Sequence, residues 1–166
     1  MKRVLAVSVG VGLCAGAALA HPHFNKTVTA SLPQGVELTI TYGTTPANEL
    51  RAQEVKVGQF VTPRRPIVKL SAELKTATVT LAAGEYTLGV IKNGEKDWTL
   101  ALYPGKIERG VTPDVTKAVK LESTFSTADG TADHMLIDVT PGHGKFEGKA
   151  VLTLHFGSLF LSGVLA

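Results

Sequence analysis

The chain has 166 residues, a formal net charge of +3, one cysteine and one tryptophan. Two of its 17 basic residues and none of its 14 acidic residues lie in positions 1–20, so residues 21–166 carry 15 basic against 14 acidic groups, a formal charge of +1. A charge this close to neutral excludes the basic surface that nucleic-acid binding requires. Residues 21–166 suffice for one domain with an ordinary hydrophobic core, and they contain no apolar run long enough to span a membrane.

Residues 1–20 have the features of a secretory signal peptide. Two basic residues open the chain, an apolar run follows, and the sequence ALA at 18–20 is the small-x-small pattern that precedes a cleavage site. We therefore expect export to the periplasm or the exterior, with a mature chain that begins at His21. The alternative is a lipid attached at Cys14, but the bulky Leu13 stands where a small residue is expected before such a cysteine. Cleavage after residue 20 removes Cys14, so the mature chain would form no disulfide.

From residue 25 onward, apolar and polar residues alternate with a period of two, which is typical of half-buried β-strands. In GVELTITYG, for example, Val36, Leu38, Ile40 and Tyr42 point to one side, and the glutamate and threonines point to the other. The same reasoning predicts strands within residues 25–32, 35–43, 76–91, 97–103, 135–139, 149–156 and 159–165.

Turn signals separate these segments. The Asn-Gly pair at 93–94 accepts the positive φ values of a tight hairpin, and the Gly-Ser pair at 157–158 gives a second hairpin signal. The sequence PRRP at 63–66 is too rich in proline for a central strand and indicates a loop or an edge. The best helical signal is Thr112, which could cap a helix whose first position is Pro113.

Strands with this composition, separated by turns about every eight to twelve residues, predict an all-β fold. We expect a single antiparallel β-sandwich, Ig-like in type, over residues 21–166, with at most one or two short helical turns. Trp98 alternates with Thr99 in its segment and is expected in the core.

The motifs of common catalytic chemistries are absent from the sequence. It has no G-x-S-x-G, no P-loop and no H-E-x-x-H, and its carboxylates are scattered singly. The only thiol is expected to leave with the signal peptide. These observations favour a binding protein over an enzyme.

The five histidines are the most informative polar residues, and all of them follow the cleavage site. As first residue, His21 would carry an α-amine with a pKa near 7.7, and this amine and the ring Nδ1 can chelate one metal ion. A second imidazole would complete the nitrogen-rich, near-planar set that suits Cu(II). Pro22 lacks an N–H and so excludes the copper site that uses the deprotonated amides of residues two and three.

The partner of His21 is left open among three histidines. His23 lies two residues along the chain, His134 follows Asp133, and His143 lies in the turn PGHGK. The alternative is that His134 is an ordinary solvent-facing strand residue and His143 an ordinary turn residue. His155 is expected on the outer face of its strand, opposite its apolar neighbours.

The adjacent Arg64 and Arg65 form a second candidate site. Paired guanidinium groups between two prolines suit the carboxylate of an anionic ligand or partner. The alternative interpretation is a solvated loop.

The order of four segments resembles an uncharacterised bacterial family of exported β-domains, DUF-2911. These segments are VELTITYGTTP, LAAGEYTLGVI, DWTLALY and GKAVLTLHFGSLFLSGVL. Where members of that family tend to carry Trp-Arg-Thr-Gly-Ala-Asn-Glu, this chain has FVTPRRP at 60–66, and Ala-Asn-Glu stands earlier, at 47–49. The resemblance implies a sandwich fold and export, without an activity.

The chain is also similar to the periplasmic copper-resistance C proteins, small sandwiches whose mature chain starts with histidine and carries a later Asp-x-His pair. His21 matches that start, whereas Asp133 and His134 are adjacent rather than spaced. This second resemblance implies a copper ligand at His21, with His143 or His134 as partner.

Taken together, the sequence predicts an exported, non-catalytic binding protein that holds Cu(II) through His21. The alternative is a metal-free envelope module that binds another protein through a sheet edge or the loop at 63–66.

Overall fold

The computed structural model describes residues 24–165. The expected signal peptide, His21 and His23 therefore lie outside the described residues. Every strand pair that is described is antiparallel, and the described residues include one short α-helix. The predicted all-β, antiparallel class is thus confirmed.

The strands are β1 (Asn25–Ser31), β2 (Glu37–Gly43), β3 (Phe60–Val61), β4 (Ile67–Leu70), β5 (Leu74–Lys75), β6 (Thr80–Leu81), β7 (Gly84–Gly94), β8 (Asp97–Pro104), β9 (Val119–Lys120), β10 (Ser123–Ser126), β11 (Ala132–Pro141), β12 (Ala150–Gly157) and β13 (Leu159–Val164). The helix is α1 (Glu49–Gln53), and three single 3-10 turns cover Pro33–Gly35, Val115–Lys117 and Gly144–Phe146.

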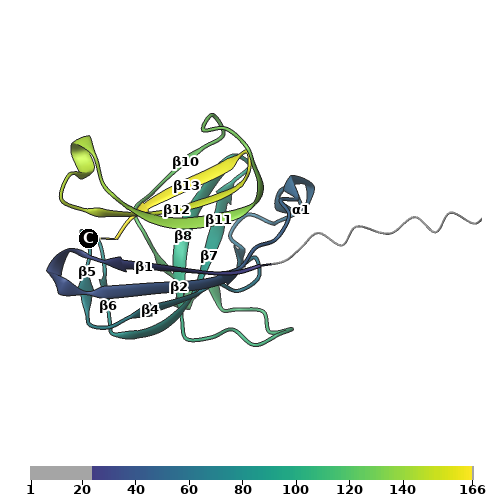
Figure 1. The fold of residues 1–166 in the computed structure, drawn as a ribbon. Coiled ribbons are helices and arrows are strands. Elements are labelled where there is room, and N and C mark those ends of the chain that lie inside the picture. Colours follow the sequence, from purple (N-terminus) through teal and green to yellow (C-terminus); the bar gives the residue numbers. More distant parts are fainter. Residues whose placement is uncertain (1–23, 166) are drawn as a thin grey trace, which may run out of the picture.

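Two sheets contain most of these strands. The larger has the order β1-β2-β4-β7-β8-β9. The short strand β3 also pairs with β7, on the same edge as β4 but further along the strand. The smaller has the order β10-β13-β12-β11. Figure 1 shows this smaller sheet, in green to yellow, lying across β1, β2 and β4 of the larger one. A separate pair, β5 with β6, completes the described strands.

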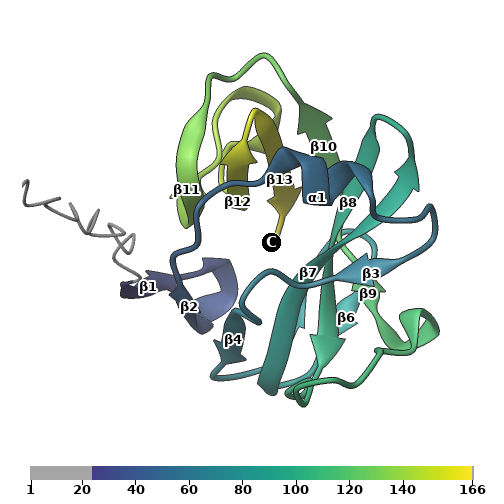
Figure 2. The same ribbon diagram turned by 90° about the vertical axis from the view of Figure 1, so that its right-hand side faces the viewer.

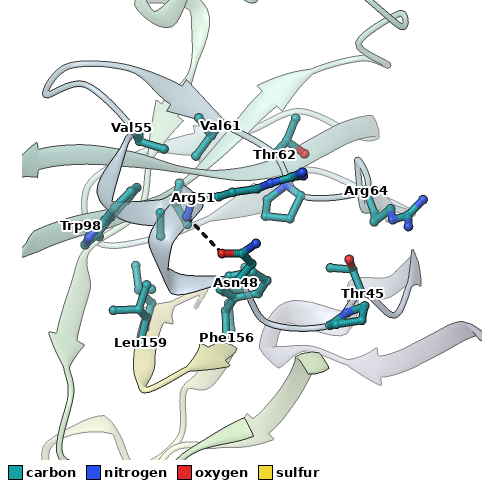
Figure 3. A pocket seen from close by; sticks show the side chains of 16 residues that line it. Thr45, Asn48, Arg51, Val55, Val61, Thr62, Arg64, Trp98, Phe156 and Leu159 are labelled. Carbon is teal, nitrogen blue, oxygen red and sulfur yellow. Dashed lines mark hydrogen bonds between the residues drawn. The ribbon is translucent and has the colours of Figure 1, made fainter. Parts of the chain in front are cut away.

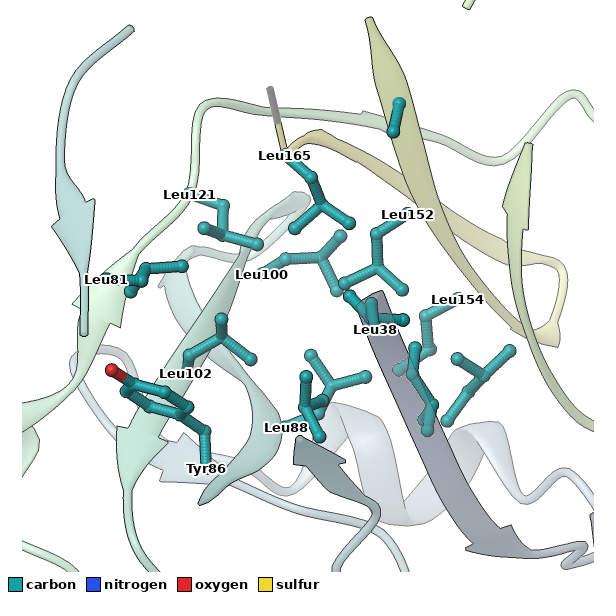
Figure 4. Close-up of a cluster of buried hydrophobic side chains, with 14 of the residues drawn as sticks. Leu38, Leu81, Tyr86, Leu88, Leu100, Leu102, Leu121, Leu152, Leu154 and Leu165 are labelled. Carbon is teal, nitrogen blue, oxygen red and sulfur yellow. The ribbon is translucent and has the colours of Figure 1, made fainter. Parts of the chain in front are cut away.

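A single large cluster of buried side chains takes residues from both sheets (Figure 4). The alternation from Val36 into β2 has the predicted sense, because Val36, Leu38, Ile40 and Tyr42 are all buried. Trp98 is also buried, as expected. The fully buried members of this cluster are mostly leucines, which come from β2, β5, β6, β7, β8 and β12 and from Leu165, the last described residue.

The hydroxyl of Tyr42 connects the two sheets directly. It donates a hydrogen bond to the carbonyl oxygen of Ile137 at 3.3 Å and accepts one from the Ile137 N–H at 3.2 Å. Both backbone groups of this β11 residue are therefore satisfied by a side chain of β2.

The prediction for the hairpin at 93–94 is wrong in detail. The hairpin between β7 and β8 exists, but the turn residues are Glu95 and Lys96, and Gly94 is not among the residues with positive φ. A register shift between Lys92 and Gly94 moves the turn by two positions. The predicted Gly157 hairpin is confirmed, since Gly157 has a φ of 65° between β12 and β13.

The helical prediction is also corrected. Near Thr112 the chain forms only the 3-10 turn Val115–Lys117, and its cap is Asp114, whose side chain accepts from the Thr116 N–H. Pro113 therefore lies before the turn. Among the described residues, no helix has the length and apolar character needed to cross a membrane.

Candidate functional site

Asp133 and His134 lie at a break in the pairing of β11 with β12, where the register shifts. Here β11 takes a different partner: the Ala47 N–H donates to the Asp133 carbonyl at 2.8 Å, and Pro46 forms an isolated bridge with His134. Irregularities of this kind redirect side chains and are common beside functional sites. The break brings His134 next to the segment that follows β2.

The first described residue, Phe24, reaches the same place. Its N–H donates to the Thr44 Oγ1 at 3.0 Å, and its carbonyl accepts from the Thr44 N–H at 2.8 Å. A surface hollow of about 350 Å³ lies here, lined by Phe24, Lys26, Thr44, Asp133, His134 and Leu136. The structure therefore brings the start of the described chain together with Asp133 and His134.

His143 lies elsewhere. It follows Pro141, the last residue of β11, and it is exposed. Because β11 rises about 3.3 Å per residue, His134 and His143 are on the order of 20 Å apart. Within residues 24–165 no group of three or more histidine, cysteine or acidic side chains could hold a metal ion.

His155 has a less exposed position than an outer strand face suggests. Its ring stacks edge-on against Phe160 with the centroids 5.3 Å apart, and its Nε2 is buried without a hydrogen-bond partner. Alternation along β12 predicts on which face of the strand His155 lies. It cannot predict the contact with Phe160, because Phe160 belongs to the neighbouring strand β13.

A pocket of about 590 Å³ opens between the two sheets near α1. Its apolar lining includes Trp98 of β8, Leu154 and Phe156 of β12, and Leu159 of β13. Its polar lining is Thr45, Asn48, Arg51, Thr62 and Arg64. Figure 3 shows these side chains around the pocket.

The two arginines predicted as a ligand loop have different positions. Both are exposed and both have positive φ, 56° at Arg64 and 48° at Arg65. Arg64 lines the pocket, whereas Arg65 does not. The loop prediction for 63–66 agrees with the structure, which has no strand between Val61 and Ile67.

Sequence reasoning missed Arg51, which α1 brings to the pocket. Asn48 caps this helix, because its Oδ1 accepts from the Arg51 N–H at 3.3 Å. An asparagine followed by a glutamate is a recognisable helix start, so the signal was present in the sequence. The helix is only five residues long and has no buried residue, which explains why periodicity did not reveal it.

No protein-family model, curated protein or solved structure matches the chain. The two family resemblances therefore stay predictions.

Proposed function

We propose that the mature chain is an exported, non-catalytic protein that binds Cu(II) between its amino-terminal histidine and His134. The observation that carries this proposal is the pair of hydrogen bonds that fixes Phe24 to Thr44, beside His134. His21 precedes Phe24 by three residues, and three residues span at most about 11 Å. A chain starting at His21 therefore begins within reach of the hollow that Asp133 and His134 line.

The donor chemistry of these groups agrees with copper. The α-amine and imidazole of His21 and the imidazole of His134 supply three nitrogens, and Asp133 lines the same hollow with a carboxylate. Nitrogen and oxygen donors in a tetragonal arrangement favour Cu(II) over harder cations. His23 is the alternative second imidazole, since it directly precedes Phe24.

The choice of His134 over His143 follows from the direction of β11. His134 lies near the end of β11 that meets Phe24, and His143 follows the opposite end. Cu–N bonds are about as long as the ~2 Å bonds of zinc, so both imidazoles must come close to the ion. We choose His134 because it lies nearer to the start of the described chain than His143 does.

We also infer that the two sheets form an Ig-like β-sandwich. The cluster of buried side chains that both sheets share supports this arrangement. In such a sandwich the hollow at His134 would lie at one edge, where β1 and β11 come together.

The test is a Cu(II) titration of the exported protein, followed by calorimetry and EPR, after mass spectrometry has established that His21 is residue one. The variants are His134→Gln and, as the matched control, His143→Gln. A third protein carries one extra residue before His21, which converts the amine to an amide.

We expect tight binding with a nitrogen-rich EPR signal in the parent protein and in His143→Gln. Loss of a residue that hydrogen-bonds to a metal ligand weakens metal affinity by about 10- to 100-fold. Loss of a ligand itself, in His134→Gln, should therefore weaken copper binding by at least about 100-fold. The extended protein should lose the signal as well. Equal affinity in all four proteins would overturn the copper proposal and favour the metal-free envelope module instead.

A further inference from the structure

The pocket between the sheets has the dimensions of a ligand site. Its volume of about 590 Å³ lies within the range of about 300–1,000 Å³ found for small-molecule sites. Such sites combine a mainly apolar wall with a few polar groups that orient the ligand. This pocket is separate from the hollow at His134, although consecutive residues contribute to the two: Thr44 lines the hollow and Thr45 lines the pocket.

Part of the apolar lining and part of the polar lining of the pocket lie on different sides. In Figure 3, Trp98, Val55 and Leu159 occupy one side, and Arg64 and Thr45 occupy the other. The Arg51 side chain extends across the pocket from α1 toward the side where Arg64 lies. The arrangement suits a molecule with an apolar body and a polar head.

The charge of the pocket is positive. Arg51 and Arg64 are the charged residues of its described lining, which contains no acidic residue. The acidic residue next to the cap of α1, Glu49, is engaged elsewhere, since both its oxygens accept hydrogen bonds from Ser158. Guanidinium groups bind carboxylates through paired N–H donors, so an anionic head is the complement of this side.

The backbone of the arginine loop supports a binding role. A positive φ is uncommon for residues other than glycine, and each such residue costs on the order of 1–3 kcal/mol. Here two consecutive arginines adopt it, between Pro63 and Pro66. The loop is held by the Thr62 hydroxyl, which donates to the Leu88 carbonyl at 2.7 Å. Conformations of this kind concentrate at ligand sites.

We propose that this pocket binds a small organic acid, with its apolar body against Trp98 and Leu159 and its carboxylate between Arg51 and Arg64. The proposal does not depend on copper binding. Medium-chain carboxylates, which have one charge and a flexible apolar body, represent this chemical class.

Trp98 provides a direct readout. It is the only tryptophan of the chain and it lines the pocket, so a ligand against its ring changes the intrinsic fluorescence of the protein. The experiment titrates metal-free protein with octanoate and, separately, with octanol, which has the same apolar body without the charge. The variants are Arg51→Gln and Arg64→Gln, with Arg65→Gln as the matched control from the same loop.

We expect octanoate to change the Trp98 emission saturably and to bind at least tenfold more tightly than octanol. Arg51→Gln and Arg64→Gln should each weaken octanoate binding at least tenfold and leave octanol binding unchanged. Arg65→Gln should bind both as the parent does. Thermal unfolding of each variant establishes that it is folded.

Three results would overturn the proposal. The first is an unchanged emission with octanoate at millimolar concentration, the second is equal affinity for octanoate and octanol, and the third is an equal effect of Arg64→Gln and Arg65→Gln. The third result would show that the charge of the loop, rather than the pocket, attracts the anion.

Discussion

Glu49 holds Ser158 with both of its carboxylate oxygens. Its Oε1 accepts from the Ser158 N–H at 2.6 Å, and its Oε2 pairs with the Ser158 hydroxyl at 3.0 Å. The two residues are 109 positions apart in the chain. The contact fixes the first turn of α1 to the hairpin between β12 and β13, and Figure 2 shows α1 beside β13 and β8. This carboxylate therefore helps to position α1, the helix that carries the pocket residues Arg51 and Ala52.

We predict that Glu49→Ala destabilises the fold by about 2–3 kcal/mol, because hydrogen bonds to a charged group contribute about 1.5–3 kcal/mol each and the Ser158 N–H is left unpaired. The free energy of unfolding in urea measures the effect. Glu54→Ala is the control, since Glu54 is exposed and follows the same helix. An equal loss of unfolding free energy in both variants would contradict a stabilising role for the hydrogen bonds between Glu49 and Ser158.

Gly89 lies where β7 passes closest to Phe60. A Cβ at this position would collide with the Phe60 ring and lie 2.5 Å from the Val61 carbonyl oxygen. Its φ is not positive, so space rather than backbone conformation requires the glycine.

We predict that Gly89→Ala destabilises the protein by at least about 1–3 kcal/mol, the usual cost of overpacking. Gly94→Ala, in the same strand, should change stability by less than about 0.5 kcal/mol, because its nearest atom would be the Asp97 Cβ at an ordinary 3.8 Å. Urea midpoints with an unchanged m-value measure both. A stable Gly89→Ala variant would contradict the tight approach of β3 to β7.

The longer strands could be predicted because alternation is a local property. The short strands β3, β4, β5, β9 and β10 were not predicted. Residues 36–42, most of which lie in β2, show it clearly, and burial follows the predicted sense. The turn at 95–96 could not be predicted in the same way, because the shift after Lys92 depends on how β7 and β8 align over their whole length. A good Asn-Gly signal was outweighed by the pairing of two long strands.

The sites were predictable only in part, for a related reason. Arg64 was identified from its own neighbours, but its partners in the pocket, Arg51 and Trp98, come from distant segments. No local pattern connects them. The choice between His134 and His143 likewise needed the direction of β11, which the sequence does not contain.

Glu85 accepts ion-pair contacts from two lysines, Lys69 at 2.8 Å and Lys106 at 3.3 Å. The hydrogen bond from Lys69, and then that from Lys106, hold the pKa of the Glu85 carboxyl below its ordinary value of 4.5. Because the pKa of Glu85 is lower in the folded protein, the carboxylate stabilises the fold at pH values above its ordinary pKa. This stabilisation is lost as the pH falls through the lowered pKa.

We therefore predict that Lys69→Met raises the pKa of Glu85, that Lys106→Met raises it less, and that Lys120→Met leaves it unchanged. Carbon-13 NMR titration of the Glu85 carboxyl follows the effect. The pKa of Glu85 in the parent protein should also move toward 4.5 in high salt, because salt screens exposed ion pairs such as those with Lys69 and Lys106. A pKa in the parent protein at or above 4.5 would contradict the two contacts.

Lys92 is a buried lysine of β7 that binds the backbone at the end of α1. Its Nζ donates to the carbonyls of Gln53 at 3.0 Å and Val55 at 2.8 Å, and it lies 5.5 Å from the centre of the Trp98 ring. These two carbonyls belong to the end of α1 and to the residues just after it, so Lys92 sets the position of the helix that carries Arg51.

We predict that Lys92→Met, which keeps the length of the side chain and removes its donors, destabilises the fold by about 1–3 kcal/mol, because two partly buried carbonyls lose their partner. Hydrogen exchange should quicken at the amides of Glu54 and Val55, which close the end of α1. Octanoate binding should weaken together with this exchange, since Arg51 moves with the helix. Lys96→Met, at the exposed turn after β7, is the control and should leave all three measurements unchanged. If Lys92→Met quickens exchange but binds octanoate as tightly as the parent, Arg51 does not hold the carboxylate, and the pocket must orient its ligand through Arg64 alone.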